Sequence, residues 1–300
     1  MKKSLIAILL IATLILTMRY NSADTKQKNK ITGVTQKENS KMYICSYRGQ
    51  ERSFLLHIPE EQNENMPLLF MLHAYAGNPE SFSRDTGMNK TADEYGYAVV
   101  YPQGIQDPND KTSGAGWNSG LKEDGNDDTG FLVALAKYLQ DTYGFNREAT
   151  FAAGFSNGAF MMYRLAVEAP ETFCAVASVA GFMTGNMWDK KSETASVGIL
   201  QINGTKDDVI PFEEDGKNNT TGSNPTINEV IEYWKNANNL EQSKEEELSK
   251  KATAITYYSD TNTNRVCYIE IKDGSHSWPQ ESFAGFNTNE VILDFFEKCR

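Results

Sequence analysis

The 300-residue sequence has no excess of positive charge. Lys and Arg total 29 against 40 Asp and Glu, so the formal net charge at pH 7 is -11. Proteins that bind nucleic acids neutralise phosphates mainly with Lys and Arg, so this balance argues against a nucleic-acid partner. An anionic membrane surface would also repel such a chain. Neutral substrates such as sugars, esters and peptides stay open.

Signatures of cofactor binding are also missing. The sequence contains no H-E-x-x-H and no phosphate-binding G-x-x-x-x-G-K, and Gly114-Ala115-Gly116-Trp117 does not complete G-x-G-x-x-G. We therefore expect neither a metal ion nor an organic cofactor.

Cysteines are few, and none lies in a C-x-x-C motif or in a Cys/His cluster with zinc spacing. The four are Cys45, Cys174, Cys267 and Cys299. In an exported protein such an even set can pair in three ways, and the sequence does not choose among them. Buried free thiols are the alternative.

The apolar run at residues 4–18 is shorter than the ~20 residues that a membrane span needs. It follows Lys2 and Lys3, which is the pattern of a secretory signal. We expect a signal peptide at residues 1–23 with cleavage after Ala23, hence a secreted protein without stable membrane insertion; an uncleaved signal would leave it membrane-anchored. Residues 24–40 lack apolar periodicity and predict a polar tail or tether. Residues 41–300 then form one catalytic domain.

Short apolar runs alternate with helical patterns through this domain. We expect strands at 67–72, 97–101, 149–155, 198–203 and 266–271, and helices at 89–95, 128–143, 159–168, from 226 and at 289–298. Thr226-x-x-Glu229 is a capping box that starts one of these helices. The alternation predicts an α/β fold with a mostly parallel central sheet and helices on both faces. The polar segments 213–224 and 241–251 predict surface insertions.

A nucleophile motif lies between an expected strand and an expected helix. Gly154-Phe155-Ser156-Asn157-Gly158 matches G-x-S-x-G and joins strand 149–155 to helix 159–168. The sharp turn leaves no room for side chains two residues on either side of the serine, which explains the glycines. We predict that Ser156 is a nucleophile; the alternative is a glycine-rich turn with an ordinary serine.

An acid and a base follow Ser156 in the order that an α/β-hydrolase requires. Asp207 comes just after strand 198–203, where a loop can present it, and its neighbour Asp208 is the alternative. The chain has three histidines, and His276 alone follows the serine, because His57 and His73 precede it. We predict that Ser156, Asp207 and His276 act together.

An oxyanion hole would complete such a site. Its usual donors are the amide after the nucleophile, here that of Asn157, and one from the loop after an early strand, here that of Tyr75. Asp127 and Asp128 resemble a paired acid/base site. We interpret them instead as helix N-terminal charges and loop anchors.

Seven separated segments carry a family resemblance. They are MLHAYAGNPESF, AVVYPQG, GWNSG with DDTGF, GFSNGAFMMYRLA, INGTKDDVIP and GSHSWP. Together, over about residues 42–300, they resemble the secreted feruloyl esterase and polyhydroxybutyrate depolymerase branch of the α/β-hydrolases. The resemblance implies a triad of Ser156, Asp207 and His276, and it favours Asp207 over Asp208.

The sequence departs from that family at three places. His73-Ala74 stands where His-Gly is usual, Asn203-Gly204-Thr205 stands for His-Gly-Thr, and the charged segment 236–251 does not resemble the corresponding region. The first departure concerns the oxyanion loop and the last concerns a wall of the substrate cleft.

The resemblance implies a secreted serine esterase that cleaves feruloyl (cinnamoyl) esters of plant cell-wall polysaccharide, or a small ester, through an acyl-serine. Acetyl xylan esterase and polyhydroxybutyrate depolymerase activities are alternatives, and a non-catalytic carbohydrate-binding protein on the same fold is an alternative of another class. Trp117 and Trp278 are expected to contact the substrate by stacking, with simple packing as the alternative.

Overall fold

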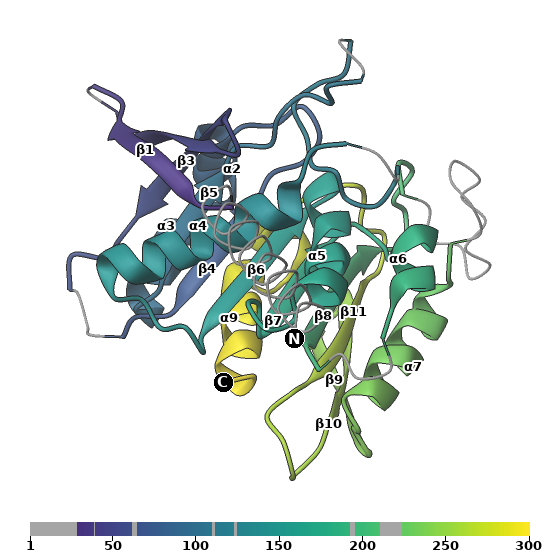
Figure 1. Cartoon of the computed structure of the whole chain (residues 1–300). Coiled ribbons are helices and arrows are strands. Elements are labelled where there is room, and N and C mark those ends of the chain that lie inside the picture. Colours follow the sequence, from purple (N-terminus) through teal and green to yellow (C-terminus); the bar gives the residue numbers. More distant parts are fainter. Residues whose placement is uncertain are drawn as a thin grey trace, which may run out of the picture.

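A computed structural model describes residues 29–38, 40–61, 65–109, 112–122, 125–192, 196–210 and 224–300. Within these ranges one sheet has the strand order β1-β2-β3-β5-β4-β6-β7-β8-β11-β10-β9 (Figure 1). The strands are β1 (Ile31–Gln36), β2 (Met42–Tyr47), β3 (Gln50–His57), β4 (Leu68–Leu72), β5 (Ala98–Pro102), β6 (Thr150–Phe155), β7 (Ala175–Val179), β8 (Gly198–Gly204), β9 (Gln242–Ser249), β10 (Ala252–Tyr258) and β11 (Val266–Ile271).

The middle of the sheet is parallel and its two margins are antiparallel. Parallel pairing runs through β5, β4, β6, β7, β8 and β11. Antiparallel pairing joins β1 to β2, β2 to β3 and β3 to β5 on one margin, and β11 to β10 and β10 to β9 on the other. Every residue of β4, β5, β7 and β8 is buried, as expected for parallel strands that are covered on both faces.

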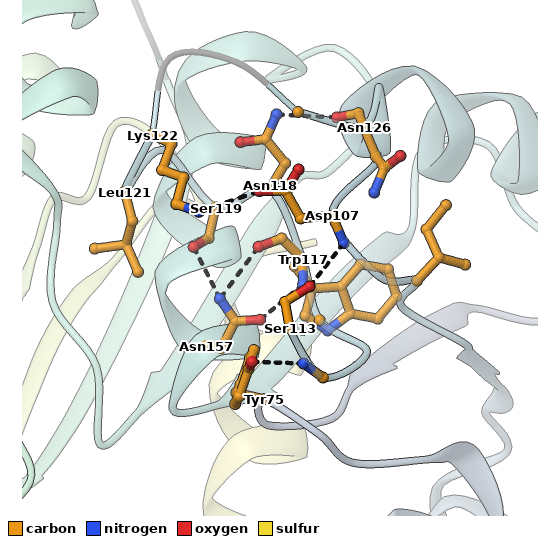
Figure 2. Close-up of a pocket in the computed structure, with 14 residues that line it drawn as sticks. Tyr75, Asp107, Ser113, Trp117, Asn118, Ser119, Leu121, Lys122, Asn126 and Asn157 are labelled. Carbon is orange, nitrogen blue, oxygen red and sulfur yellow. Dashed lines mark hydrogen bonds and ion pairs between the residues drawn. The ribbon is translucent and has the colours of Figure 1, made fainter. Parts of the chain in front are cut away.

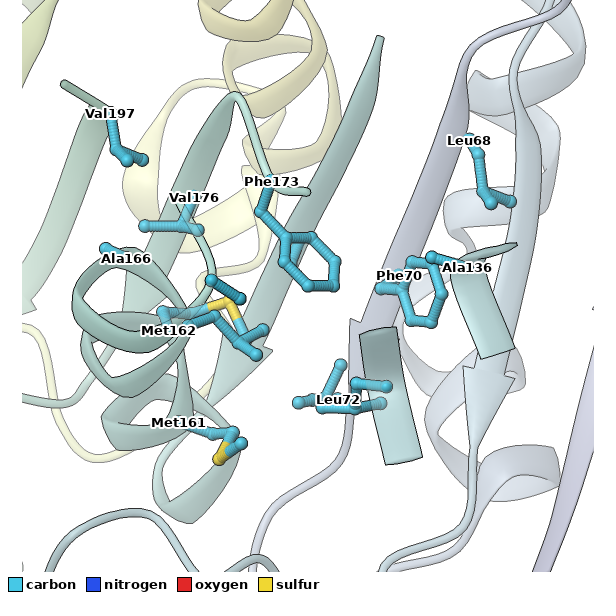
Figure 3. Close-up of a cluster of buried hydrophobic side chains, with 14 of the residues drawn as sticks. Leu68, Phe70, Leu72, Ala136, Met161, Met162, Ala166, Phe173, Val176 and Val197 are labelled. Atoms are coloured by element: carbon cyan, nitrogen blue, oxygen red, sulfur yellow. The ribbon is translucent and has the colours of Figure 1, made fainter. Parts of the chain in front are cut away.

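Helices supply that cover. They are α2 (Pro79–Thr86), α3 (Met88–Tyr95), α4 (Asp128–Tyr143), α5 (Asn157–Glu168), α6 (Gly185–Lys190), α7 (Ile227–Ala237), α8 (Glu281–Ala284) and α9 (Thr288–Lys298). Helices α4, α5 and α7 bury apolar residues on one face of the sheet, in a cluster that includes Met162, Phe173 and Phe70 (Figure 3). Helices α2, α3 and α9 bury theirs on the other face. The predicted α/β-hydrolase architecture is confirmed.

Two predictions at the margins are wrong. Residues 31–36, placed in the polar tail, form β1, and Ile31 is buried. Residues 242–249, placed in the insertion at 241–251, form the edge strand β9, whose middle residues are exposed. Edge strands face water and often carry charge. Their polar composition therefore did not predict strands, although each pairs with a more apolar neighbour. The other expected insertion, 213–224, lies outside the described residues apart from Asn224.

The start of α7 follows the sequence prediction. Thr226 accepts a hydrogen bond from the Glu229 amide, and the Glu229 carboxylate accepts one from the Thr226 amide. This reciprocal capping satisfies donors that a helix start leaves unpaired.

The four cysteines are free, and Cys45, Cys267 and Cys299 are buried. Of the two alternatives for the cysteines, the structure therefore has free thiols. The predicted signal peptide lies outside the described residues. In the part of the chain that is described, no helix is both long and apolar enough to cross a membrane.

Candidate active site

Ser156 occupies a strained turn between β6 and α5. Its backbone has φ 54° and ψ -114°, and its amide donates to the Val179 carbonyl at 3.0 Å. A side chain at Gly154 would clash with the Gly158 carbonyl, and one at Gly158 would clash with the Leu72 carbonyl. The close approach of α5 to β6 and β4 therefore requires both glycines, and it lifts the serine hydroxyl above the sheet.

A chain of two hydrogen bonds joins three side chains at the carboxyl ends of the strands. His276 Nε2 lies 3.0 Å from Ser156 Oγ, and His276 Nδ1 lies 2.8 Å from Asp207 Oδ2. With Nδ1–H donating to the carboxylate, Nε2 is free to accept the serine proton. The arrangement has the geometry of a nucleophile, a base and an orienting acid.

Asp207, and not Asp208, takes part in this chain. The Asp207 side chain is fully buried, and its Oδ1 accepts hydrogen bonds from the amides of Val209 at 3.0 Å and Ile210 at 2.7 Å. These two donors aim the second oxygen at His276. Asp208 is exposed.

His276 is held from the side as well. The Phe155 ring lies against the imidazole, with 5.1 Å between the ring centroids. The His276 side chain is mostly buried, at 14% exposed. A partly dry setting strengthens its bond to the carboxylate.

Asn157 begins α5, where backbone amides lack partners within the helix. Its side chain does not point to solvent. Oδ1 accepts from the Trp117 amide at 2.7 Å, and Nδ2 donates to the Trp117 carbonyl at 3.2 Å and to Ser119 Oγ at 3.0 Å. The side chain thus fixes the turn that carries the amide.

Tyr75 lies in the loop after β4, and its amide makes no hydrogen bond within the described residues. The loop is tied to its neighbour by the Ala76 amide, which donates to the Ala115 carbonyl at 2.6 Å. The Tyr75 hydroxyl accepts from the Gly114 amide at 2.5 Å, although the side chain is 56% exposed. These two contacts hold the loop through its main chain and through the Tyr75 ring.

His73 belongs to the oxyanion-loop motif His73-Ala74, which predicted no role for its side chain. It is fully buried, its Nε2 accepts from the Gly104 amide at 2.9 Å, and its Nδ1 donates to the Ala74 carbonyl at 2.7 Å. Burial lowers the pKa of the imidazole, so it is neutral. It fastens the start of the Tyr75 loop to the end of β5.

A pocket of about 180 Å³ lies beside Tyr75 and Asn157 (Figure 2). Its lining comprises Tyr75, Ile105, Asp107, Ser113, Gly114, Gly116, Trp117, Asn118, Ser119, Leu121, Lys122, Gly125, Asn126 and Asn157. Lys122 Nζ and Asp107 Oδ2 form an ion pair at 3.1 Å on its wall. None of the described residues in the loops that carry Asp207 and His276 belongs to this lining.

The two adjacent aspartates are anchors, as predicted. Asp127 is the N-cap of α4 and accepts from the Gly130 amide at 3.1 Å. Asp128 is fully buried and accepts from Arg52 Nη2 at 2.8 Å and from the Asn118 amide at 2.7 Å. Burial raises the pKa of the Asp128 carboxyl.

The two tryptophans differ in position. Trp117 lines the pocket, but it is only 5% exposed and its polar atoms are bonded within the protein. Trp278 is 8% exposed and meets Phe82 edge to face at 5.6 Å, so it packs in the core and is absent from the pocket's lining.

Known proteins are similar to this chain in sequence. A family model described as "Esterase PHB depolymerase" matches residues 52–233, more than half of the chain. The protein NocK of Nocardia uniformis subsp. tsuyamanensis, which is named as an esterase, is 28% identical over 261 residues, covering 78% of this chain and 73% of NocK. Feruloyl esterase B of Talaromyces funiculosus is 25% identical over 194 residues, covering 59% of this chain and 53% of that protein.

Solved structures share the fold at lower identity. An acetyl xylan esterase from Aspergillus awamori superposes with a TM-score of 0.60 at 14% identity, covering 82% of this chain and 94% of that one. An S-formylglutathione hydrolase from Agrobacterium tumefaciens gives 0.57 at 12% identity, covering 90% and 100%.

Proposed function

This chain belongs to the PHB depolymerase esterase family and is a carboxylic ester hydrolase, and we propose that Ser156, Asp207 and His276 are its catalytic triad. The observation that carries the proposal is the continuous Ser156–His276–Asp207 hydrogen-bonded chain, with bonds of 3.0 and 2.8 Å. Such a chain is what activates a serine hydroxyl at neutral pH.

The reaction proceeds in two halves. His276 Nε2 takes the proton of Ser156 as its oxygen attacks the ester carbonyl, and Asp207 stabilises the imidazolium that forms. The protonated His276 then gives that proton to the departing alcohol, which leaves an acyl-serine. Water activated by the same nitrogen attacks the acyl-serine, and the acid is released.

The backbone amides of Asn157 and Tyr75 form the oxyanion hole of this mechanism. Neither amide donates a hydrogen bond within the described part of the chain: one begins α5 and the other lies in the loop after β4. Fixed main-chain donors stabilise the charge on the carbonyl oxygen without reorganising during the reaction.

The pocket beside these amides receives the acyl group. The leaving alcohol has to lie within reach of His276 Nε2, which protonates it, and the described residues of the His276 and Asp207 loops do not line the pocket. The acyl group occupies the remaining direction. Tyr75, Ile105 and Leu121 offer apolar surface to it, while Asp107, Lys122 and Asn118 offer polar groups.

A flat aromatic acyl group with polar substituents can contact both the apolar and the polar residues of this lining. An acetyl group is too small to use these contacts. We therefore propose feruloyl esters of plant cell-wall polysaccharide as the substrate. The similarity to a feruloyl esterase supports this choice. Acetylated xylan and 3-hydroxybutyrate oligomers are the alternatives. We also propose that the protein is secreted, because the apolar run at residues 4–18 follows Lys2 and Lys3 as in a secretory signal.

Hydrolysis of methyl ferulate, 4-nitrophenyl acetate and 3-hydroxybutyrate oligomers tests the proposal. We expect the highest kcat/KM with the ferulate, and Ser156→Ala and His276→Ala to lower kcat with it by about 10³-fold or more. Full activity of Ser156→Ala would exclude the triad. An unmodified protein that turns over no ester but binds glycans would favour the carbohydrate-binding alternative.

A pocket-filling variant tests the acyl assignment separately. Leu121→Trp should lower kcat/KM for methyl ferulate about tenfold or more, because one misfitted group in a pocket costs on the order of 1–3 kcal/mol. The same variant should leave 4-nitrophenyl acetate within about twofold. Equal effects on both esters would place the acyl group elsewhere.

A further inference from the structure

Trp117 contacts both halves of the oxyanion hole with hydrogen bonds. Its main chain pairs with the Asn157 side chain, through an amide donor at 2.7 Å and a carbonyl acceptor at 3.2 Å. Its indole Nε1–H donates to the His73 carbonyl at 2.9 Å. His73 lies two residues before Tyr75, and Asn157 follows the nucleophile.

We propose that Trp117 is a positioning residue that fixes the separation and direction of the Tyr75 and Asn157 amides. The inference rests on the proposed roles of Ser156 and of these two amides. The peptide groups of Trp117 bind the Asn157 side chain at the start of α5, and its indole binds the His73 carbonyl at the start of the Tyr75 loop. The two donors come from segments about 80 positions apart in the chain, and Trp117 bridges them.

The surroundings of Trp117 keep it from moving. The next residue, Asn118, donates its amide to buried Asp128 at 2.7 Å and accepts at its carbonyl from Arg164 Nη1 at 2.6 Å. Asp128 belongs to α4 and Arg164 to α5, so the position of Trp117 is tied to two helices. Asp128 is in turn paired with buried Arg52 of β3.

The other end of the bridge is also fixed. The His73 ring lies 5.2 Å from the Trp117 ring, centroid to centroid, and accepts a hydrogen bond from the Gly104 amide. A glycine at 116 leaves the space that the Asn157 side chain needs, because an added Cβ would lie 2.9 Å from Asn157 Oδ1. The bridge is therefore tightly packed from Asn157 to His73.

Such a device matters for catalysis more than for substrate binding. Oxyanion donors act at about 2.7–3.1 Å from the developing charge, and a displacement of about 1 Å can cost ~10²-fold in rate. A ground-state carbonyl carries less charge, so its binding is less sensitive to the same displacement.

Trp117→Phe removes the indole donor and keeps an aromatic ring. With 4-nitrophenyl acetate, whose acyl group does not fill the pocket, we expect kcat to fall by about 10- to 100-fold and KM to stay within about twofold. Inhibition by phenylboronic acid, which forms a tetrahedral adduct on serine, should weaken by a similar factor. Trp234→Phe is the matched control, since Trp234 is fully buried in α7 and its Nε1 has no partner among the described residues.

The inference would be overturned if Trp117→Phe kept a kcat within twofold of the parent. This holds whether its KM rises or only its Tm falls, and a fall in Tm alone is what we expect of Trp234→Phe. If Trp117→Phe does not fold, Asn157→Ala provides the test, because it removes the side chain that holds Trp117 and keeps the oxyanion amide. A Ser156→Ala variant that retains full activity would instead refute the triad.

Discussion

The two halves of the active site are built in different ways. The relay half consists of three side chains on three loops, joined by two hydrogen bonds, with the acid oriented by two neighbouring amides. The proposed oxyanion half consists of the main-chain amides of Asn157 and Tyr75. Hydrogen bonds from buried side chains of β3, α4, α5 and the loops after β4 and β5 surround these amides. The triad side chains need only to lie within hydrogen-bonding distance of one another. Main-chain donors are placed correctly only if the backbone that carries them is itself held in position.

The largest effect should come from breaking the relay half at its acid. Asp207→Asn should lower kcat by about 10⁴-fold, because an amide stabilises the wrong imidazole tautomer. Asp208→Asn, its exposed neighbour, is the matched control and should retain activity. Steady-state kinetics with one ester measures both, and equal losses would contradict the assignment.

Loosening the support of the oxyanion half should cost stability as well as rate. Asp128→Ala leaves Arg52 buried without its ion-pair partner, which typically costs about 3–5 kcal/mol. Asp127→Ala removes a helix cap and an exposed ion pair, so about 0.5–2 kcal/mol is expected. Urea unfolding gives both values, and similar losses would argue against Asp128 as the buried anchor.

The smallest effect should be a pH dependence that belongs to the oxyanion half. The pKa of buried His73 is lowered from its ordinary 6.5, so the unfolded chain takes up a proton before the folded one does. Its contribution to stability is complete above pH 6.5 and is lost as pH falls toward the lowered pKa. His73→Gln should therefore reduce the drop in Tm between pH 7 and pH 5, and an unchanged drop would contradict the buried, neutral state.

Much of the fold follows from the sequence because buried parallel strands are continuous apolar runs. The strands expected around Leu68–Leu72, Ala98–Pro102 and Gly198–Gly204 occur within a residue or two of their predicted bounds. The margins were not predictable in this way. The Glu-rich strand Gln242–Ser249 and the polar strand Ile31–Gln36 are stabilised by pairing with a neighbour, which local composition does not reveal.

In the site, too, local motifs were predictable from the sequence, whereas contacts between distant segments were not. Ser156, Asp207 and His276 each follow a strand in a readable motif, so the sequence predicted the residues that the structure brings together. Trp117 and His73 act through hydrogen bonds between loops that are distant in sequence, and no pattern marks such bonds. Trp278 packs edge to face on Phe82 and is 8% exposed, which favours the packing alternative, because an aromatic beside a catalytic loop can equally serve the core.

The four cysteines are free and three of them are buried, so the fold does not depend on the redox state of its surroundings. Burial raises the pKa of Cys45 and Cys267 to about 11 and that of Cys299 to about 12, so little thiolate exists to react with oxidants or disulfides. The sheet is held without a covalent cross-link, and refolding need not wait for oxidative pairing. Reducing agents should therefore neither inactivate the enzyme nor be needed to recover it.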